Sequence, residues 1–252
     1  MNDNNNDEMP VHRRFLLDVA EGRATLLAKK DCFRFKCTQC GGCCRNNTIL
    51  LKPYDIYRLS RSLGMTTGDF LKKHCVRYTG KDSGLPLAIL RFRDNGRGAC
   101  PFLVGGRCSV HADRPSVCRL YPLGTVALGD EGPKYYLQPV QCPGYGKGRP
   151  QTVRRWLRQA KLRKYTEKNK RFFDLIGYIV RSRVLEHGIL HLVSTLSELF
   201  YDPDGWVPGL ARNRSVPVPD DWDGMFSLIE NTARELVGGI VRAREESEGK
   251  AA

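Results

Sequence analysis

The sequence has no long hydrophobic run. Its best apolar candidate, Leu175 to Val180, is short and is interrupted by Gly177 and Tyr178. A membrane-spanning helix needs roughly 20 consecutive apolar residues, so we expect no membrane span. The first residues are polar and lack the basic start and apolar core of a signal peptide. These absences favour a cytoplasmic protein.

The sequence also lacks a glycine-rich phosphate loop and a nucleophile elbow. It therefore gives no sign of a nucleotide fingerprint or of a serine-hydrolase site, and no catalytic or cofactor-binding residue can be named. Acidic residues are the other shortage, because 27 of them face 41 lysines and arginines, for a net charge of +14. Part of this excess can balance metal-bound thiolates, and the rest suggests an acidic protein or nucleic-acid partner.

Cysteine is plentiful, but it is confined to one part of the chain. The ten cysteines all lie between Cys32 and Cys142, and none follows. This density is too low for a small disulfide scaffold, and thiols in a reducing compartment usually cluster because they bind metal. The cysteines therefore predict a metal-binding subregion.

We predict an α+β fold that is mainly helical, with short β-hairpins around a cysteine-rich metal-binding core. Residues 1–10 are polar and are expected to be disordered, 11–148 to form the cysteine-cluster domain, and 149–252 to form a helical C-terminal extension packed on the same domain. Apolar spacing and turn residues give the individual elements. Helices are expected over 11–30, 53–63, 67–73, 153–160, 189–200 and 220–240, a strand over 88–92, a hairpin joining 125–128 to 135–137, and a loop over 201–219.

The central motif is Cys37-Thr38-Gln39-Cys40-Gly41-Gly42-Cys43-Cys44. Four thiols this close in sequence can converge only if the backbone turns tightly, which Gly41 and Gly42 permit because glycine tolerates positive φ. Adjacent cysteines rarely direct both side chains at one metal. Cys43 and Cys44 therefore either serve different metals, or one of them lies outside the ligand shell.

Four later cysteines complete the candidate site. A turn at Gly105-Gly106 can bring Cys100 close to Cys108, and a hairpin folded near Asp130 can place Cys118 opposite Cys142. Eight thiolates suit two four-thiolate sites, or one iron–sulfur cluster and a separate zinc. The predicted ligands are Cys37, Cys40, Cys43, Cys44, Cys100, Cys108, Cys118 and Cys142.

Alternative roles stay open for some of these residues. The clustered cysteines could be buried free thiols, or Cys37 and Cys40 could form a redox dithiol. Cys32 and Cys75 lie outside the motifs and are interpreted as small core residues. His111, beside Cys108, is expected to pack or hydrogen-bond locally, with ligation as its alternative.

A basic segment follows the cysteine region. Between Lys147 and Arg183 thirteen basic residues face only Glu167 and Asp174, with aromatic residues interspersed. Such a segment can bind nucleic acid through phosphates and stacking. The alternative is a solvated helix whose aromatic residues face the core.

The cysteine motifs resemble a known family. The run Cys37-x-x-Cys40-x-x-Cys43-Cys44-Arg45, followed by Cys100-Pro101-Phe102-Leu103, Cys108-Ser109-Val110-His111 and Arg114-Pro115-x-x-Cys118-Arg119, resembles the YkgJ-type cysteine-cluster family. The resemblance covers about 32–146, including the helix that begins near Asp55. It implies zinc or iron chelation at the eight cysteines named above and names no reaction.

Three functional hypotheses follow. The first is a zinc or iron–sulfur protein whose centre is structural or redox-active. The second is an S-adenosylmethionine-dependent protein lysine methyltransferase with an iron–sulfur centre, because the flagellin lysine-N-methylases are a related group, although 150–252 match none of their motifs. The third is nucleic-acid or acidic-partner binding through 147–183.

Overall fold

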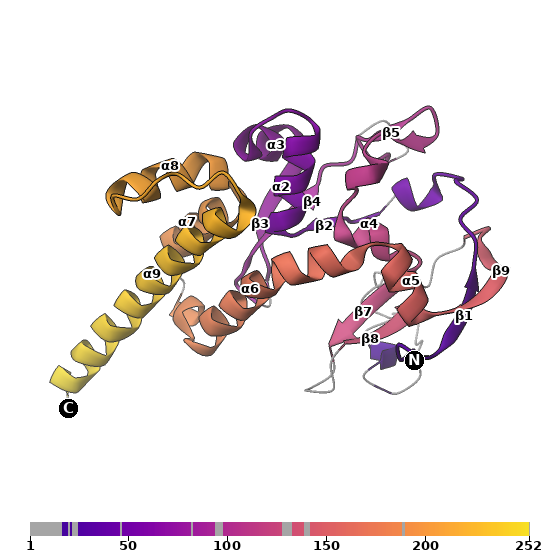
Figure 1. Cartoon of the computed structure of the whole chain (residues 1–252). Coiled ribbons are helices and arrows are strands. Elements are labelled where there is room, and N and C mark those ends of the chain that lie inside the picture. Colours follow the sequence, from indigo (N-terminus) through magenta and orange to yellow (C-terminus); the bar gives the residue numbers. More distant parts are fainter. Residues whose placement is uncertain are drawn as a thin grey trace, which may run out of the picture. The chain divides into compact units, whose positions relative to one another are not determined.

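Figure 1 shows the computed structural model. It describes residues 17–19, 21, 25–45, 47–81, 83–93, 98–127, 133–138, 142–187 and 190–251. The fold is α+β and mainly helical, as predicted. The chain divides into two compact units, one formed by 1–42 and 119–162 and the other by 43–118 and 163–252. Each unit thus combines residues from both sides of position 148.

The first unit contains two small antiparallel sheets. Strand β1 (Cys32–Phe35) pairs with β9 (Tyr145–Thr152), and β7 (Leu123–Ala127) pairs with β8 (Pro133–Leu137). Helix α5 (Val153–Gln159) follows β9 directly and is capped by Thr152, whose hydroxyl accepts a hydrogen bond from the Arg155 N–H.

A small aromatic core holds the first unit together. β1 alternates exposed and buried residues, which is the pattern of a strand with one face in water. Its buried residues, Phe33 and Phe35, both meet the ring of Trp156 edge to face, at centroid distances of 6.0 and 5.6 Å. Leu123 and Val153 are fully buried beside them.

The second unit is built on a three-stranded sheet of order β2-β4-β3. Its strands are β2 (Leu50–Leu51), β3 (Cys75–Thr79) and β4 (Pro86–Leu90). Helices α2 (Pro53–Ser62) and α3 (Thr67–His74) lie between β2 and β3 in the chain. Pro53 occupies the first turn of α2, and the Thr66 hydroxyl accepts from the Asp69 N–H at the start of α3.

Long helices supply most of the core of the second unit. They are α6 (Leu162–Arg181), α7 (Leu190–Tyr201), α8 (Pro203–Asn213) and α9 (Trp222–Ala251), with a short 3₁₀ turn, η4 (Val184–His187), between α6 and α7. Ile56, Phe70, Leu196 and Phe226 are completely buried in this core. No helix in the described part of the chain is long and apolar enough to cross a membrane.

Most of the predicted elements are present. The helices at 53–63, 67–73, 153–160 and 189–200 are confirmed within one or two residues, although residue 189 lies outside the described residues. The hairpin at 125–128 and 135–137 is confirmed as β7 and β8, although residue 128 lies outside the described residues. At the start of α9 the Asp221 carboxylate accepts from the Gly224 N–H at 2.8 Å. Half of the predicted helix at 11–30 lies outside the described residues. Of the rest, 17–19 are helical, but the helix predicted over 25–30 is wrong, because no residue of this segment is helical and Leu27 forms an antiparallel bridge with Tyr135.

The expected loop at 201–219 is wrong, because its first part forms α8. Proline was treated there as a helix breaker, but Pro203 sits in the first turn, where its missing N–H is not needed. The carboxylate of Asp202 accepts from the Gly205 N–H at 3.2 Å and caps the helix. Strand β3 was not predicted.

Candidate metal centre

Backbone pairing in the second unit places Cys44 beside Cys100. Cys44 ends a 3₁₀ turn, η1 (Gly42–Cys44), and its carbonyl accepts a hydrogen bond of 2.8 Å from the Cys100 N–H. The next residue, Arg45, forms an antiparallel bridge with Ala99. These contacts bring the end of the early cysteine motif to the first of the late cysteines.

A tight turn then brings Cys108 back toward Cys100, as predicted. Strands β5 (Leu103–Val104) and β6 (Arg107–Cys108) form a two-stranded hairpin in which Leu103 lies opposite Cys108. Gly105 and Gly106 have φ values of 55° and 77°, so both central residues of the turn adopt the left-handed conformation that glycine tolerates best. Ser109 donates its N–H to the Phe102 carbonyl at 2.8 Å and closes the loop.

Cys118 is carried by α4 (Ser116–Leu120), whose start is anchored by a buried carboxylate. Asp55 is fully buried and accepts hydrogen bonds from the Ser116 N–H at 2.8 Å and the Ser116 hydroxyl at 2.9 Å. It also accepts from the Lys52 N–H at 3.1 Å. Burial raises the pKa of Asp55, while the Lys52 charge and these hydrogen bonds oppose the shift. Asp55 therefore positions α4, and its carboxylate oxygens are engaged in hydrogen bonds.

The thiols gathered in this unit influence one another electrostatically. A hydrogen bond between the Cys43 and Cys44 thiols raises the pKa of Cys43 and lowers that of Cys44. Burial raises the pKa of Cys118, and the nearby thiols of Cys100 and Cys108 raise it further. The thiols in this group, the second-unit thiol group, are Cys43, Cys44, Cys100, Cys108 and Cys118.

Backbone N–H groups point at two of these sulfur atoms. Burial raises the pKa of Cys100 and of Cys108, but an N–H two residues later, at Phe102 and Val110 respectively, donates to each sulfur and lowers its pKa. An N–H directed at sulfur stabilises the thiolate form, which is the form that binds metal. This repeated arrangement fits a site built for thiolates.

The first unit contains the remaining predicted ligands, Cys37, Cys40 and Cys142. The Gln39 N–H lies 3.4 Å from the Cys37 sulfur, which repeats the arrangement at Cys100 and Cys108. Gly41 has a positive φ of 70°, as expected for a residue that turns the chain. The second position in the motif with positive φ is Gln39 (55°) and not Gly42.

Cys142 reaches the same region as Cys37 through the β1–β9 pairing. Phe35 lies opposite Tyr145, and the Lys36 N–H donates to the Gly144 carbonyl at 3.1 Å. A Cβ at Gly144 would lie 2.5 Å from the Lys36 carbonyl oxygen, so this close approach requires glycine. Because the pairing runs up to Lys36, Cys37 and Cys142 lie near the ends of neighbouring segments. The Cys142 thiol also hydrogen-bonds Tyr121, and burial together with this bond raises the pKa of Tyr121.

The structure thus distributes the eight predicted ligands between two groups, five in one unit and three in the other. The expected placement of Cys118 opposite Cys142 on an extended hairpin is wrong, because Cys118 lies on α4 and not on an extension of β7. Among the described residues, no three cysteine, histidine, aspartate or glutamate side chains are arranged as they stand to hold one metal ion. Their sulfur donors suit zinc or iron rather than magnesium or calcium.

Several residues that hold these loops were missed by sequence reasoning. Arg93 donates to the carbonyls of Pro101 (2.6 Å) and Leu103 (2.9 Å) and so braces the Cys100 loop. Arg58 forms an ion pair with Asp113, just before the Arg114-Pro115 segment. Asp55 and Arg58 lie in the helix that the family resemblance includes, but neither their partners nor their role was predicted.

The other candidates have mixed outcomes. Cys75 is buried, as expected, but Cys32 is exposed, so its interpretation as a core residue is wrong. It occupies a position on β1 that alternates toward water. The His111 ring nitrogen Nδ1 lies 3.1 Å from the Arg114 guanidinium, in keeping with the local contact expected for it.

Comparison with known proteins finds one family model that matches the cysteine region. A family model described as "CxxCxxCC: Putative zinc- or iron-chelating domain" matches 36–143, a range that includes all eight predicted ligands. No match was found among curated proteins or among solved structures. The segment 36–143, which is 108 of the 252 residues, is therefore similar to the CxxCxxCC family.

Proposed function

We propose that this protein binds zinc or an iron–sulfur cluster through its cysteine thiolates, and that the centre is structural or carries electrons. The observation that supports this most directly is the second-unit thiol group. Its five thiols come from three separate stretches of the chain, and two of them receive a backbone N–H. Thiols that only filled space in a core would not need such donors.

The ligand number fits this proposal. Zinc and iron–sulfur clusters both take four thiolates, and the second-unit thiol group supplies five sulfur atoms. Cys37, Cys40 and Cys142 are the other three predicted ligands and lie in the first unit. Among the described residues, no three potential ligand side chains are arranged to hold one ion as they stand. On metal binding, the thiol side chains must therefore rotate until their sulfur atoms face one point.

The surrounding charges favour thiolate over thiol. Arg93 lies near Cys100 and Arg114 near Cys108, and each lowers the pKa of its neighbouring thiol. Burial acts in the opposite direction, and a bound cation would offset that cost because it replaces the proton. When bound, zinc would cross-link the loops, and an iron–sulfur cluster could also accept and donate one electron.

The proposal is tested by comparing cysteine variants after anaerobic purification. Cys100→Ser and Cys108→Ser should lose most of the bound metal, because each removes a thiolate that the structure prepares for ligation. Cys32→Ser is the matched control, since Cys32 is an exposed thiol outside the motifs. Equal metal content in all three variants would contradict the assignment of ligands.

A further inference from the structure

The basic segment that follows the cysteine region differs along its length in how many of its cations have acidic partners. On α6, four cations have acidic partners: Arg163 pairs with Glu167, Lys168 with Asp223, Lys170 with Asp174 and Arg171 with Glu230. These contacts are internal to the second unit. They leave α6 with much less free positive charge than its sequence suggests.

The preceding helix, α5, is different. Its three arginines, Arg154, Arg155 and Arg158, are exposed and have no acidic partner among the residues described in the structure. No acidic residue occurs anywhere from 132 to 162, whereas seven lysines and arginines do. The unpaired positive charge of the segment is therefore concentrated on α5 and on the end of β9.

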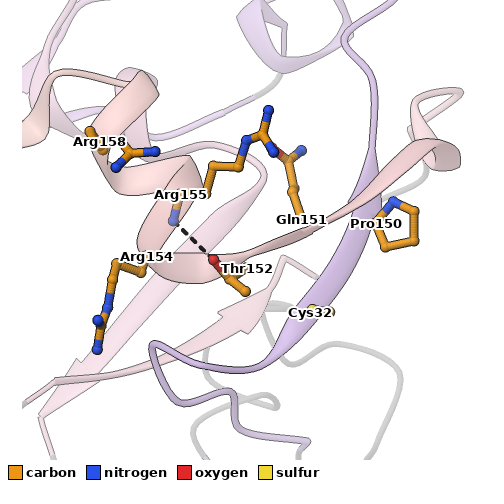
Figure 2. Close-up of a pocket in the computed structure, with 7 residues that line it drawn as sticks. All are labelled: Cys32, Pro150, Gln151, Thr152, Arg154, Arg155 and Arg158. Carbon is orange, nitrogen blue, oxygen red and sulfur yellow. Dashed lines mark hydrogen bonds between the residues drawn. The ribbon is translucent and has the colours of Figure 1, made fainter.

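These arginines line an open cavity of about 410 Å³ in the first unit (Figure 2). Pro150, Gln151 and Thr152, at the end of β9, and Cys32 on β1 form the rest of its lining. Figure 2 shows the side-chain ends of Arg155 and Gln151 close to one another, with Arg158 one turn further along α5 and Arg154 extending away from them. The cavity thus joins a strand end to one side of a helix, and we call it the arginine groove.

Strand β1 extends the charge of the groove. Arg34 lies opposite Pro150, and Cys32 lies opposite Thr152, in the antiparallel pairing. Cys32 and Arg34 share the exposed face of β1, because Phe33 between them points into the core. The Arg34 guanidinium donates to the Gly148 carbonyl at 3.2 Å, which holds this fourth arginine against β9.

We propose that the arginine groove binds the phosphodiester backbone of a nucleic acid. Arginine binds phosphate oxygens through two parallel N–H donors, and threonine and glutamine side chains commonly add further phosphate contacts. Thr152 keeps its hydroxyl proton available, because its oxygen accepts from Arg155.

The lining favours a nucleic acid over an acidic protein. Protein interfaces obtain most of their affinity from aromatic and other large anchors in dry pockets. The seven residues of the groove lining include no aromatic side chain and no aliphatic one apart from Pro150. Phosphate binding needs none, because its affinity comes from charge and counterion release.

The proposal is tested by fluorescence anisotropy with a labelled single-stranded DNA of about 20 nucleotides over a salt series. The full-length protein is compared with the variant Arg154→Gln/Arg155→Gln/Arg158→Gln. We expect this variant to bind at least about tenfold more weakly and its salt slope to fall by about 2, which corresponds to three lost phosphate contacts. Its circular dichroism and metal content should equal those of the wild type, because the three side chains are exposed.

The control removes the same charge from α6, as Arg163→Gln/Lys164→Gln/Lys170→Gln, and should stay within about twofold of the wild type. A second readout is alkylation of Cys32, which the DNA should slow in the wild type and not in the groove variant. The proposal would be overturned if the wild type failed to bind DNA at low salt, or if the control lost as much affinity as the groove variant. Equal displacement of the DNA by polyglutamate would assign the groove to an acidic protein instead.

Discussion

The buried carboxylate of Asp55 accepts hydrogen bonds from both the N–H and the hydroxyl of Ser116, which lies 61 residues later in the chain. Asp55 belongs to the first turn of α2, and Ser116 begins the helix that carries Cys118. This contact fixes one of the predicted ligands to the core of the second unit.

Asp55→Asn should therefore weaken both the fold and the candidate centre. The amide keeps one acceptor but places donors against Ser116 and Lys52, so we expect a loss of about 2 kcal/mol in the free energy of unfolding. Metal content should fall as well, because α4 is no longer held in place. Denaturant unfolding and metal analysis measure the two effects. Asp220→Asn, at an exposed position, is the control and should change neither.

The turn between Cys100 and Cys108 gives a second prediction. At Gly106 the added methyl group of alanine would meet nothing within 4 Å, so the cost of Gly106→Ala comes only from the positive φ of 77°. We expect a destabilisation of about 1 kcal/mol. Gly239→Ala also meets nothing within 4 Å but lies inside α9, where alanine should stabilise by about 0.5 to 1 kcal/mol. Shifts of the same sign in thermal unfolding would contradict this reasoning.

The pH dependence of stability should report on Asp204. This carboxylate accepts from Arg61 at 2.6 and 2.8 Å and from the Thr67 N–H at 2.8 Å, linking α8 to α2 and α3. Burial alone would raise the pKa of Asp204, but the Arg61 and Thr67 hydrogen bonds outweigh it and lower the pKa below the ordinary value of 3.8. Because the folded state binds this proton more weakly, the contribution is present above the ordinary pKa and is lost as the pH falls through the lowered value.

Asp204→Asn removes that titration. Its free energy of unfolding should be lower than that of the wild type at neutral pH by about 1 to 2 kcal/mol, and the difference should shrink during acidification below about pH 4. Chemical denaturation at a series of pH values measures both curves. Parallel curves throughout would show that Asp204 does not titrate with the expected coupling.

Thiol reactivity should depend on the metal. Of the cysteines classed as exposed, Cys32 is the one outside the predicted ligand set, whereas Cys37, Cys40 and Cys43 belong to it. In the metal-loaded protein an alkylating reagent should modify Cys32 first, and a chelator should release the other three. Mass spectrometry of the modified peptides distinguishes these sites. Rapid alkylation of Cys37 and Cys40 in fully loaded protein would exclude them as ligands.

Local patterns were enough to predict elements whose signals lie within a few residues. The spacing of Ile56, Leu59 and Leu63 with Pro53 in the first turn predicted α2, and Gly105-Gly106 predicted the turn before Cys108. α8 was missed because proline was treated as a helix breaker, whereas Pro203 lies in the first turn after the Asp202 cap and Pro208 lies inside the helix. β3 was missed because its extended conformation depends on its pairing with β4, which lies further along the chain.

The candidate site was predictable in its ligand types and not in its grouping. The cysteines stand out in the sequence, but their division into the second-unit thiol group and the trio Cys37, Cys40 and Cys142 depends on pairings such as Arg45 with Ala99 and Phe35 with Tyr145. Those pairings join residues more than fifty positions apart. For the same reason, no local pattern indicates that Asp55 reaches Ser116.

The most direct test is the metal content and visible spectrum of the wild-type protein isolated without oxygen. The proposed function predicts at least about one equivalent of zinc or of an iron–sulfur cluster, with a brown protein that absorbs at about 400 nm if the metal is iron. A colourless protein with about one equivalent of zinc would support the zinc centre. Less than one equivalent of every metal, with and without oxygen, would contradict the proposed metal centre.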